Sequence, residues 1–360
     1  MSKTNEAKTA LDTVIRKARV HFYKPIQIAE ILFRHRTGKR NAKPDLADLE
    51  TYRNISKRWR DDVSSRLVGR RSTSSARYQD DVFNENAMPP RLLAVLGKIN
   101  IESGGGVESY IYNALLSKLS EVLHVRRYIA TTTPETFSIL RLVDMFVARA
   151  GLKRSTDKIY EIAVHALFST IVRALRAEIT LSIKNEDEEI LADFERFIKM
   201  VLGISKDQTT VSMPAALFRV GVTNAADSGL DMWANFGTAI QVKHLTLTPE
   251  LTEEIVDGIE ADRIVIVCLD AERGPIEALL LQLGLRDRVQ GIITLSDLNE
   301  WYALCLNEHY RGRLAETLLA DIGREFDAEF PASTEIDPFI SEREYNTIAP
   351  PTGWTIIEPE

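Results

Sequence analysis

The stretch of sequence that decides the fold runs from Leu217 to Leu247 and reads Leu-Phe-Arg-Val-Gly-Val-Thr-Asn-Ala-Ala-Asp-Ser-Gly-Leu-Asp-Met-Trp-Ala-Asn-Phe-Gly-Thr-Ala-Ile-Gln-Val-Lys-His-Leu-Thr-Leu. Its first residues are prone to form a β-strand, and the small and polar residues at 225–229 then interrupt the run. Apolar residues resume at 232–236, Gly237 predicts a turn, and 238–247 has the composition of another strand. The stretch therefore predicts three strands, of which the last two form an antiparallel hairpin.

The predicted hairpin brings Asp231 close to Gln241 and Lys243. Because side chains alternate along a strand, Gln241 and Lys243 point to the same face. Mg²⁺ prefers oxygen ligands and keeps several of its waters, so Asp231, the amide oxygen of Gln241 and a backbone carbonyl near Val242 could hold this ion. Lys243 would then lie beside a metal-bound water and an incoming phosphate. The alternative is a hairpin with an exposed Asp and Lys, whose ion pair would contribute little to stability.

The segments on either side of this stretch predict an α/β domain. Before this stretch, apolar residues recur at helical spacing. After it, segments with helical spacing alternate with short apolar strands. The predicted elements are helices at 156–176 and 186–202, then a helix at 249–259, a strand at 263–269, a helix at 274–283, a strand at 289–295 and a helix at 297–306. This order predicts a mixed sheet flanked by helices.

The N-terminal part of the chain is predicted to be helical and basic. Residues 1–130 hold 24 Lys and Arg against 14 Asp and Glu, a balance of +10, whereas the remainder has a balance of −17. Such an asymmetry is typical of a protein that approaches a polyanion with one face. The alternative is two surfaces of opposite sign that dock on each other or on a partner subunit.

The residues expected to contact nucleic acid lie in three basic segments. Guanidinium groups bind phosphate bidentately, hydroxyl groups add neutral donors, and Arg is the usual reader of guanine in the major groove. The candidates are Lys39 and Arg40 in a loop, Lys57 and Arg58 on a helix, and Arg70, Arg71, Ser72 and Arg77 in the run that follows that helix. The alternative for this last run is an ordinary solvated loop.

The bulk composition narrows the class of protein. No run of eighteen apolar residues is present, so no membrane span is expected, and the N-terminus lacks the apolar core of a signal peptide. The two cysteines, Cys268 and Cys305, have no metal-like spacing and suggest a reducing cytoplasm. We expect a helical DNA-binding region at 1–150, a catalytic core at 151–330 and an extended, Pro-rich tail at 331–360.

The spacing from Asp231 to Gln241-Val-Lys243 resembles the active-site signature of the PD-(D/E)XK nuclease superfamily. Asp227-Ser-Gly-Leu-Asp231 resembles the approach to the catalytic Asp in its Mrr-like branch. The wider chain resembles type II restriction endonucleases of the HaeII-like group. The stretches that carry this second resemblance are Tyr23-Lys-Pro-Ile-Gln-Ile-Ala-Glu-Ile-Leu, Leu49-Glu-Thr-Tyr-Arg-Asn-Ile-Ser-Lys-Arg-Trp-Arg, Arg71-Ser-Thr-Ser-Ser-Ala and Val222-Thr-Asn-Ala-Ala-Asp-Ser-Gly-Leu-Asp-Met-Trp.

The resemblance implies a PD-(D/E)XK core and Mg²⁺-dependent cleavage of both strands of a short palindromic DNA site, in a bacterial cytoplasm. It also implies a homodimer, a companion DNA methyltransferase and a target similar to purine-GCGC-pyrimidine. Gln241 stands where many members have Glu or Asp, so a second acid would be needed at the metal. Asp227 and Glu195 are candidates, and Glu178 competes with Glu195.

Two other functions are compatible with the same core. One is a repair or modification-dependent DNA nuclease, and the other is a DNA-binding protein with an inactive core. The presence of both Asp231 and Lys243 argues against the inactive protein. The sequence therefore favours a site-specific DNA endonuclease.

Overall fold

The computed structural model describes residues 2–39, 43–69, 71, 82–149, 151–205, 207–220, 230–242, 263–284 and 286–355. The chain divides into two compact units, which are described separately. Unit 1 is built mainly from Met1–Ile162 and Ile322–Glu360, and unit 2 from Ala163–Val220 and Ser228–Asp321. None of the described helices combines the length and the apolar character needed to cross a membrane.

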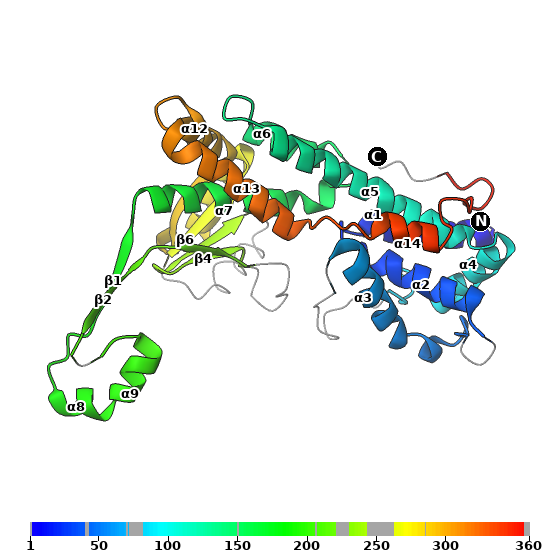
Figure 1. The fold of residues 1–360 in the computed structure, drawn as a ribbon, viewed down its shortest axis with the longest axis horizontal. Coiled ribbons are helices and arrows are strands. Elements are labelled where there is room, and N and C mark those ends of the chain that lie inside the picture. Colours follow the sequence, from blue (N-terminus) through cyan, green and yellow to red (C-terminus); the bar gives the residue numbers. More distant parts are fainter. Residues whose placement is uncertain are drawn as a thin grey trace. The chain divides into compact units, whose positions relative to one another are not determined.

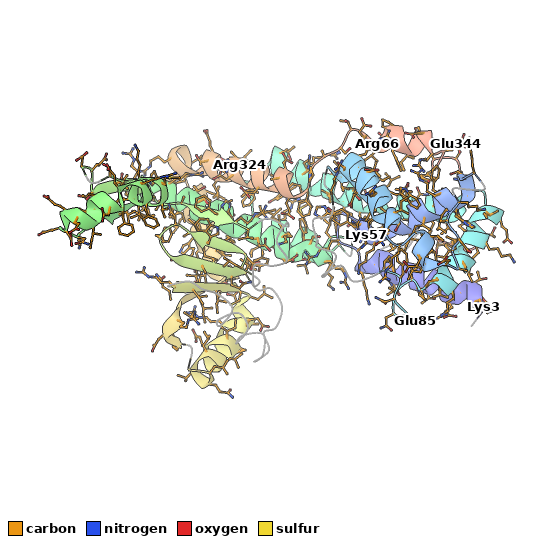
Figure 2. The ribbon with its side chains drawn as sticks, turned by 90° about the horizontal axis from the view of Figure 1, so that it is seen from below. Lys3, Lys57, Arg66, Glu85, Arg324 and Glu344 are labelled. Carbon is orange, nitrogen blue, oxygen red and sulfur yellow. The ribbon has the colours of Figure 1, made fainter. Side chains whose placement is uncertain are left out.

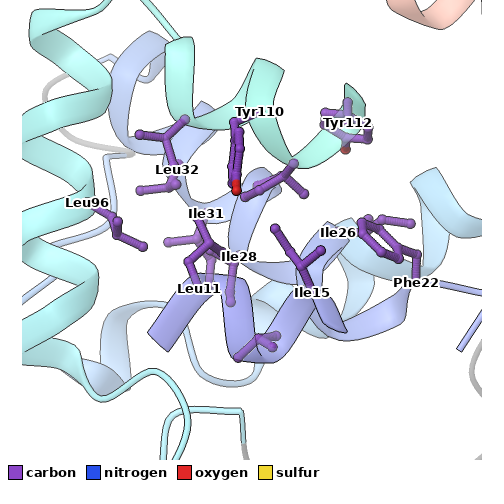
Figure 3. Close-up of a cluster of buried hydrophobic side chains, with 14 of the residues drawn as sticks. Leu11, Ile15, Phe22, Ile26, Ile28, Ile31, Leu32, Leu96, Tyr110 and Tyr112 are labelled. Atoms are coloured by element: carbon purple, nitrogen blue, oxygen red, sulfur yellow. The ribbon is translucent and has the colours of Figure 1, made fainter. Parts of the chain in front are cut away.

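Unit 1 is helical, as the sequence predicts for the N-terminal region. Its helices are α1 (Lys3–Lys17), α2 (Tyr23–Thr37), α3 (Ile55–Val68), α4 (Pro90–Glu102), α5 (Gly106–Thr131), α6 (Ile139–Val147) and α14 (Ile336–Glu342), with the first turns of α7 (Thr156–Ala174) and most of α13 (Glu316–Glu329). Aliphatic side chains from α1, α2 and α4 meet two tyrosines of α5 in its core (Figure 3). Removing this apolar surface from water is the main force that holds the helices together.

A buried polar network ties the C-terminal segment to this helical bundle. The Glu108 carboxylate accepts hydrogen bonds from Arg36 at 2.9 and 2.8 Å, from the Asn100 amide at 2.6 Å and from the Tyr345 hydroxyl at 2.8 Å. Because each of these donors reaches an ionised acceptor, the bonds are stronger than ordinary ones. Gly105, at φ +108°, allows the chain to pass Arg36, since an added Cβ would lie 3.0 Å from the guanidinium group.

The segment expected to be an extended tail contains a short helix and buried anchors. Phe339, Ile340 and Tyr345 are buried in the core of unit 1, and the Tyr345 ring stacks on Tyr112 with ring centroids 4.9 Å apart. Trp354 packs edge-on against Tyr110, with ring centroids 5.2 Å apart. The aromatic anchors explain why this Pro-containing segment follows the bundle closely.

Unit 2 is built on a five-stranded mixed sheet, which confirms the α/β prediction (Figure 1). Its strands, in sheet order, are β3 (Leu217–Arg219), β4 (Met232–Ala234), β5 (Thr238–Val242), β6 (Arg263–Cys268) and β7 (Val289–Thr294). The pairs β3–β4 and β4–β5 are antiparallel, and β5–β6 and β6–β7 are parallel.

Helices cover the two faces of this sheet. On one face, α11 (Arg273–Gln282) packs Ile276 and Leu280 on Ala239, Ile264 and Ile266. On the other face lie α7 and α12 (Leu295–Leu306), where the Tyr302 hydroxyl donates to the Ala163 carbonyl at 2.8 Å and the Phe168 ring packs against Trp301. Further short helical turns are η1 (Leu49–Thr51) and η2 (Lys153–Ser155) in unit 1, and η4 (Asp270–Glu272), η5 (Arg286–Arg288) and η6 (Arg311–Ala315) in unit 2.

A separate two-stranded ribbon precedes the sheet and was not predicted. β1 (Glu178–Ser182) and β2 (Thr210–Pro214) pair antiparallel, and α8 (Glu188–Asp193), α9 (Glu195–Phe197) and the π-turn η3 (Ile198–Leu202) lie between them. The predicted helix at 186–202 is thus present as three shorter pieces. Asn235 links the ribbon to the sheet, since its side chain accepts from the Ala216 amide at 2.8 Å and donates to the Pro214 carbonyl at 3.0 Å.

Candidate active site

The predicted meeting of Asp231 with Gln241 is present at one end of the β4–β5 hairpin. Met232 pairs with Ile240 in the ladder, so the register places Asp231 opposite Gln241. The Asp231 Oδ2 atom accepts hydrogen bonds from the Gln241 side-chain amide at 2.6 Å and from the Val242 backbone amide at 2.8 Å. The hairpin therefore fixes the orientation of this carboxylate from two sides.

The orientation of Gln241 differs from the expectation. The sequence analysis assigned its amide oxygen to a cation shared with Asp231, whereas the structure turns the amide nitrogen towards Asp231. The residue is only 1% exposed, and its Oε1 atom is buried without a hydrogen-bond donor among the described residues. A buried carbonyl oxygen without a donor is unfavourable, so this position would accept a donor or a cation readily.

Towards the parallel strands β5 and β6, the Asp231–Gln241 pair is bordered by apolar side chains. Gln241 is the register partner of Ile266, and the neighbouring Cys268 is buried in the same cluster beneath α11. Burial raises the pKa of the Cys268 thiol to about 11, so the thiol is neutral and acts as a core side chain. Cys268 is therefore one of the buried side chains of this cluster.

The other expected site residues are less fully placed. Lys243 and Asp227 lie outside the described residues. Glu178 and Glu195 lie in β1 and α9, which belong to the ribbon and not to the five-stranded sheet. Within the described ranges, no group of three or more His, Cys, Asp or Glu side chains is arranged to hold a metal ion. Among the described residues, the ligands available to a cation at this end of the β4–β5 hairpin are Asp231, Gln241 and main-chain carbonyls.

Comparison with known proteins identifies the family. The sequence matches the HaeII restriction endonuclease family over residues 7–345. The chain belongs to this family. It is 47% identical to the type II restriction enzyme HaeII of Haemophilus aegyptius over 348 residues, which is 96% of this chain and 98% of that protein. It is 48% identical to the type II restriction enzyme NgoBI of Neisseria gonorrhoeae over 335 residues, which is 93% of this chain and 94% of that protein.

No solved structure matches the chain. The resemblance to the HaeII-like group is nevertheless confirmed by the family match and by both relatives. The enzyme is a type II restriction enzyme, a site-specific deoxyribonuclease. Its substrate class is therefore DNA.

The basic residues of α3 fall into two groups in this restriction enzyme. Arg66 is held by Glu335 at 3.1 Å and Glu342 at 2.7 Å, and Arg60 is buried beside Asp61. Lys57 and Arg58 are at least partly exposed, and neither has an acidic partner within the part of the chain that the structure describes. Lys57 and Arg66 both extend from α3 (Figure 2). Structural ion pairs thus occupy part of this basic helix and leave Lys57 and Arg58 accessible to solvent.

The remaining DNA-contact candidates lie mostly beyond the described ranges. Lys39 and Arg71 are exposed to solvent. Arg40, Arg70, Ser72 and Arg77 lie outside the described residues. Trp233 and Phe218 were not among the predicted site residues, although Trp233 is only two residues from Asp231. That two-residue spacing was the available signal, because it places both side chains on one face of a strand.

Proposed function

We propose that this enzyme cuts both strands of duplex DNA with an active site of the PD-(D/E)XK type formed by Asp231, Gln241 and Lys243. The observation that supports this proposal best is the pairing of Asp231 with Gln241 across the β4–β5 hairpin, at 2.6 Å. The strand order and directions of unit 2 agree with the mixed sheet that the resemblance implies. The nuclease core would occupy 151–330 and the DNA-binding region 1–150.

The residues present fit a Mg²⁺ ion. The Asp231 carboxylate and the Gln241 oxygen that lacks a donor are the oxygen ligands that this ion prefers, and the Val242 carbonyl and Asp227 would complete the protein ligands. When bound, Mg²⁺ neutralises charge on the phosphate and lowers the pKa of its water ligands.

The protein groups have separate tasks in this reaction. Asp231, whose position is set by the Val242 amide and Gln241, provides the negative charge that retains the cation beside the scissile phosphate. Gln241 orients that carboxylate and carries no charge, so the site has one fewer negative group than relatives with Glu or Asp there. Lys243 stabilises the negative charge that develops on the phosphate oxygens.

The rest of the molecule would hold the DNA. The exposed Lys39, Arg58 and Arg71 and the partly exposed Lys57 would contact phosphates together with Arg40, Arg70, Ser72 and Arg77, at a target similar to purine-GCGC-pyrimidine. A palindromic target is matched by a homodimer, in which each copy cuts one strand. Such an enzyme acts in the bacterial cytoplasm beside a DNA methyltransferase that protects the host sites.

Two single substitutions test the active site. Asp231→Ala and Lys243→Ala should each slow cleavage on the order of a hundredfold or more while specific DNA binding persists. Asp287→Ala, which removes an exposed carboxylate on η5, is the matched control and should cut normally. Near-normal cleavage by either of the first two variants would remove this assignment of the active site.

A further inference from the structure

An exposed aromatic pair lies on the edge strand β3 and its neighbour β4, beside the candidate active site. Phe218 of β3 and Trp233 of β4 are direct register partners. Their rings stack with centroids 4.4 Å apart and an interplanar angle of 23°. The two side chains are 42% and 44% exposed, although both are large and apolar.

This pair points to the same face of the sheet as Asp231. Side chains two residues apart on a strand share a face, so Asp231 and Trp233 lie on one side of β4. The ladder continues through both residues, because Trp233 pairs with Ala239 and the Val220 amide donates to the Asp231 carbonyl at 2.9 Å. Trp233 is therefore about 6.6 Å along the strand from Asp231, at about 3.3 Å per residue.

Helix α11 covers the inner strands on this face of the sheet but leaves Phe218 and Trp233 uncovered. The apolar cluster under α11 includes Ala239, Ile264 and Ile266 of the inner strands. Phe218 and Trp233 lie outside that cluster, at the end of the sheet where both rings meet solvent. Exposing adjacent aromatic rings to water is unfavourable, and such adjacent exposure typically marks a surface that binds something.

We propose that Phe218 and Trp233 form a platform that packs against the sugar and base of one nucleotide of the DNA substrate. The proposal rests on the proposed active site at Asp231. A separation of about 6.6 Å corresponds to about two rises of 3.4 Å along one DNA strand, so the contacted nucleotide is one or two steps from the phosphate cut at Asp231. In a duplex the neighbouring bases cover each base face, so the contact is made with the deoxyribose and with a base that is partly unstacked from its neighbours. The outer face of an aromatic ring can pack on such a base whatever its sequence.

The platform would position the strand and would not read its sequence. The pair carries no hydrogen-bonding pattern that matches one base, apart from the single indole N–H of Trp233. Its contribution should therefore be similar for specific and unrelated duplexes. It should also be insensitive to salt, because the contact neutralises no phosphate.

The test measures binding in EDTA, so that no cleavage is needed. Affinities are determined for duplexes that contain the sequence cut by the wild-type enzyme, intact or with one abasic nucleotide moved step by step through the site. Trp233→Ala should weaken binding to the intact duplex about 5- to 150-fold, the range for losing one base–aromatic stack. Trp233→Phe should retain most of the affinity, and Phe197→Ala, which removes a 53% exposed ring on α9, is the matched control and should bind normally.

The decisive result is coupling between the protein and DNA changes. At one position, the abasic substitution should weaken binding to the wild-type enzyme by a similar factor and have no further effect on Trp233→Ala. If Trp233→Ala does not fold, tryptophan fluorescence tests the same contact. Duplex should quench the fluorescence of the wild-type enzyme, and this quenching should be absent in Trp233→Phe. Unchanged affinity of Trp233→Ala, or equal abasic penalties in both proteins at every position, would overturn the proposal. A change of oligomeric state without such coupling would overturn it in favour of a contact between two copies of the chain.

The outcome is separable from that of the proposed active site. If Asp231→Ala still cuts DNA while the abasic coupling is present, the active-site assignment fails and the aromatic contact stands. If Asp231→Ala is inactive and no coupling is found, the active site stands and the aromatic contact fails.

Discussion

Replacing Gln241 by Glu would convert the observed hydrogen bond into a contact between two carboxyl groups. In the wild-type protein the Gln241 amide donates to Asp231 at 2.6 Å from a side chain that is 1% exposed. In Gln241→Glu, two carboxylates this close cannot both be ionised without a cation, so the pKa of one is raised. The folded variant therefore binds a proton that the unfolded chain releases.

The loss of stability in Gln241→Glu can be calculated from the cost of keeping one carboxyl group protonated. An ordinary Glu has a pKa of about 4.3, and holding it protonated at pH 7 costs about 1.36 kcal/mol per pH unit, or about 3.7 kcal/mol. Since the folded state binds more protons than the unfolded state above pH 4.3, the stability of the variant should fall as pH rises from about 4.3 to 7. A cation between the carboxylates replaces the proton, and at a concentration a hundredfold above its Kd it would restore about 2.7 kcal/mol.

Thermal unfolding at pH 7 with EDTA or Mg²⁺ measures this prediction. At about 2–4 °C per kcal/mol, Gln241→Glu should unfold several degrees below wild type in EDTA and recover several degrees in Mg²⁺. Gln27→Glu is the matched control, because Gln27 is also buried but donates to Ser56, in unit 1. A Mg²⁺ response of Gln241→Glu no larger than that of this control would refute a cation site at Asp231.

Two further predictions concern unit 1. The Lys118 ammonium donates to the Ala18 carbonyl at 2.6 Å, and burial lowers its pKa from 10.5 to about 8. Between these pH values the unfolded chain binds more protons than the folded chain, so this group adds stability as pH rises from 8 to 10.5, by up to about 3 kcal/mol. Urea unfolding at pH 7.5 and 10 should show that the stability of wild type increases relative to Lys118→Met, and a constant difference would contradict this account. In Tyr345→Phe, Glu108 loses the hydroxyl donor at 2.8 Å, which should cost about 1.5–3 kcal/mol of unfolding free energy. The control Tyr310→Phe should change stability by less than about 0.5 kcal/mol. An equal loss in both variants would show that the hydrogen bond to Glu108 does not stabilise unit 1.

The β4–β5 hairpin was predictable because its determinants are local. Residues 238–242 and the turn at Gly237 fix the register, and the register alone brings Asp231 opposite Gln241. The orientation of the Gln241 amide was not predictable, because spacing does not say which end of an amide faces a carboxylate. That detail depends on the neighbouring strands and on the Val242 amide, which shares the same carboxylate oxygen.

The elements that the sequence analysis missed have weak local signals. β1 and β2 each alternate apolar and polar residues, but over only five residues that are largely exposed. They pair across a 27-residue excursion, and so short an alternation does not by itself predict a strand. The C-terminal segment was expected to be extended because of its prolines. Its position depends instead on long-range partners, such as the contact of Tyr345 with Glu108, which no local pattern reveals.

The construction of unit 1 from both ends of the chain has a consequence for biosynthesis. Phe339, Ile340 and Tyr345 complete a core whose other buried members lie more than two hundred residues earlier in the sequence, and Arg343 reaches Glu30 at 3.5 Å. Domains usually form in the order in which they leave the ribosome. Here the sheet of unit 2 is synthesised before Ile322–Glu360 of unit 1, so the core of the helical unit can be completed only after the sheet has been made. Under the division proposed above, the growing chain would therefore contain its whole five-stranded sheet before the helical unit that is proposed to hold DNA is complete.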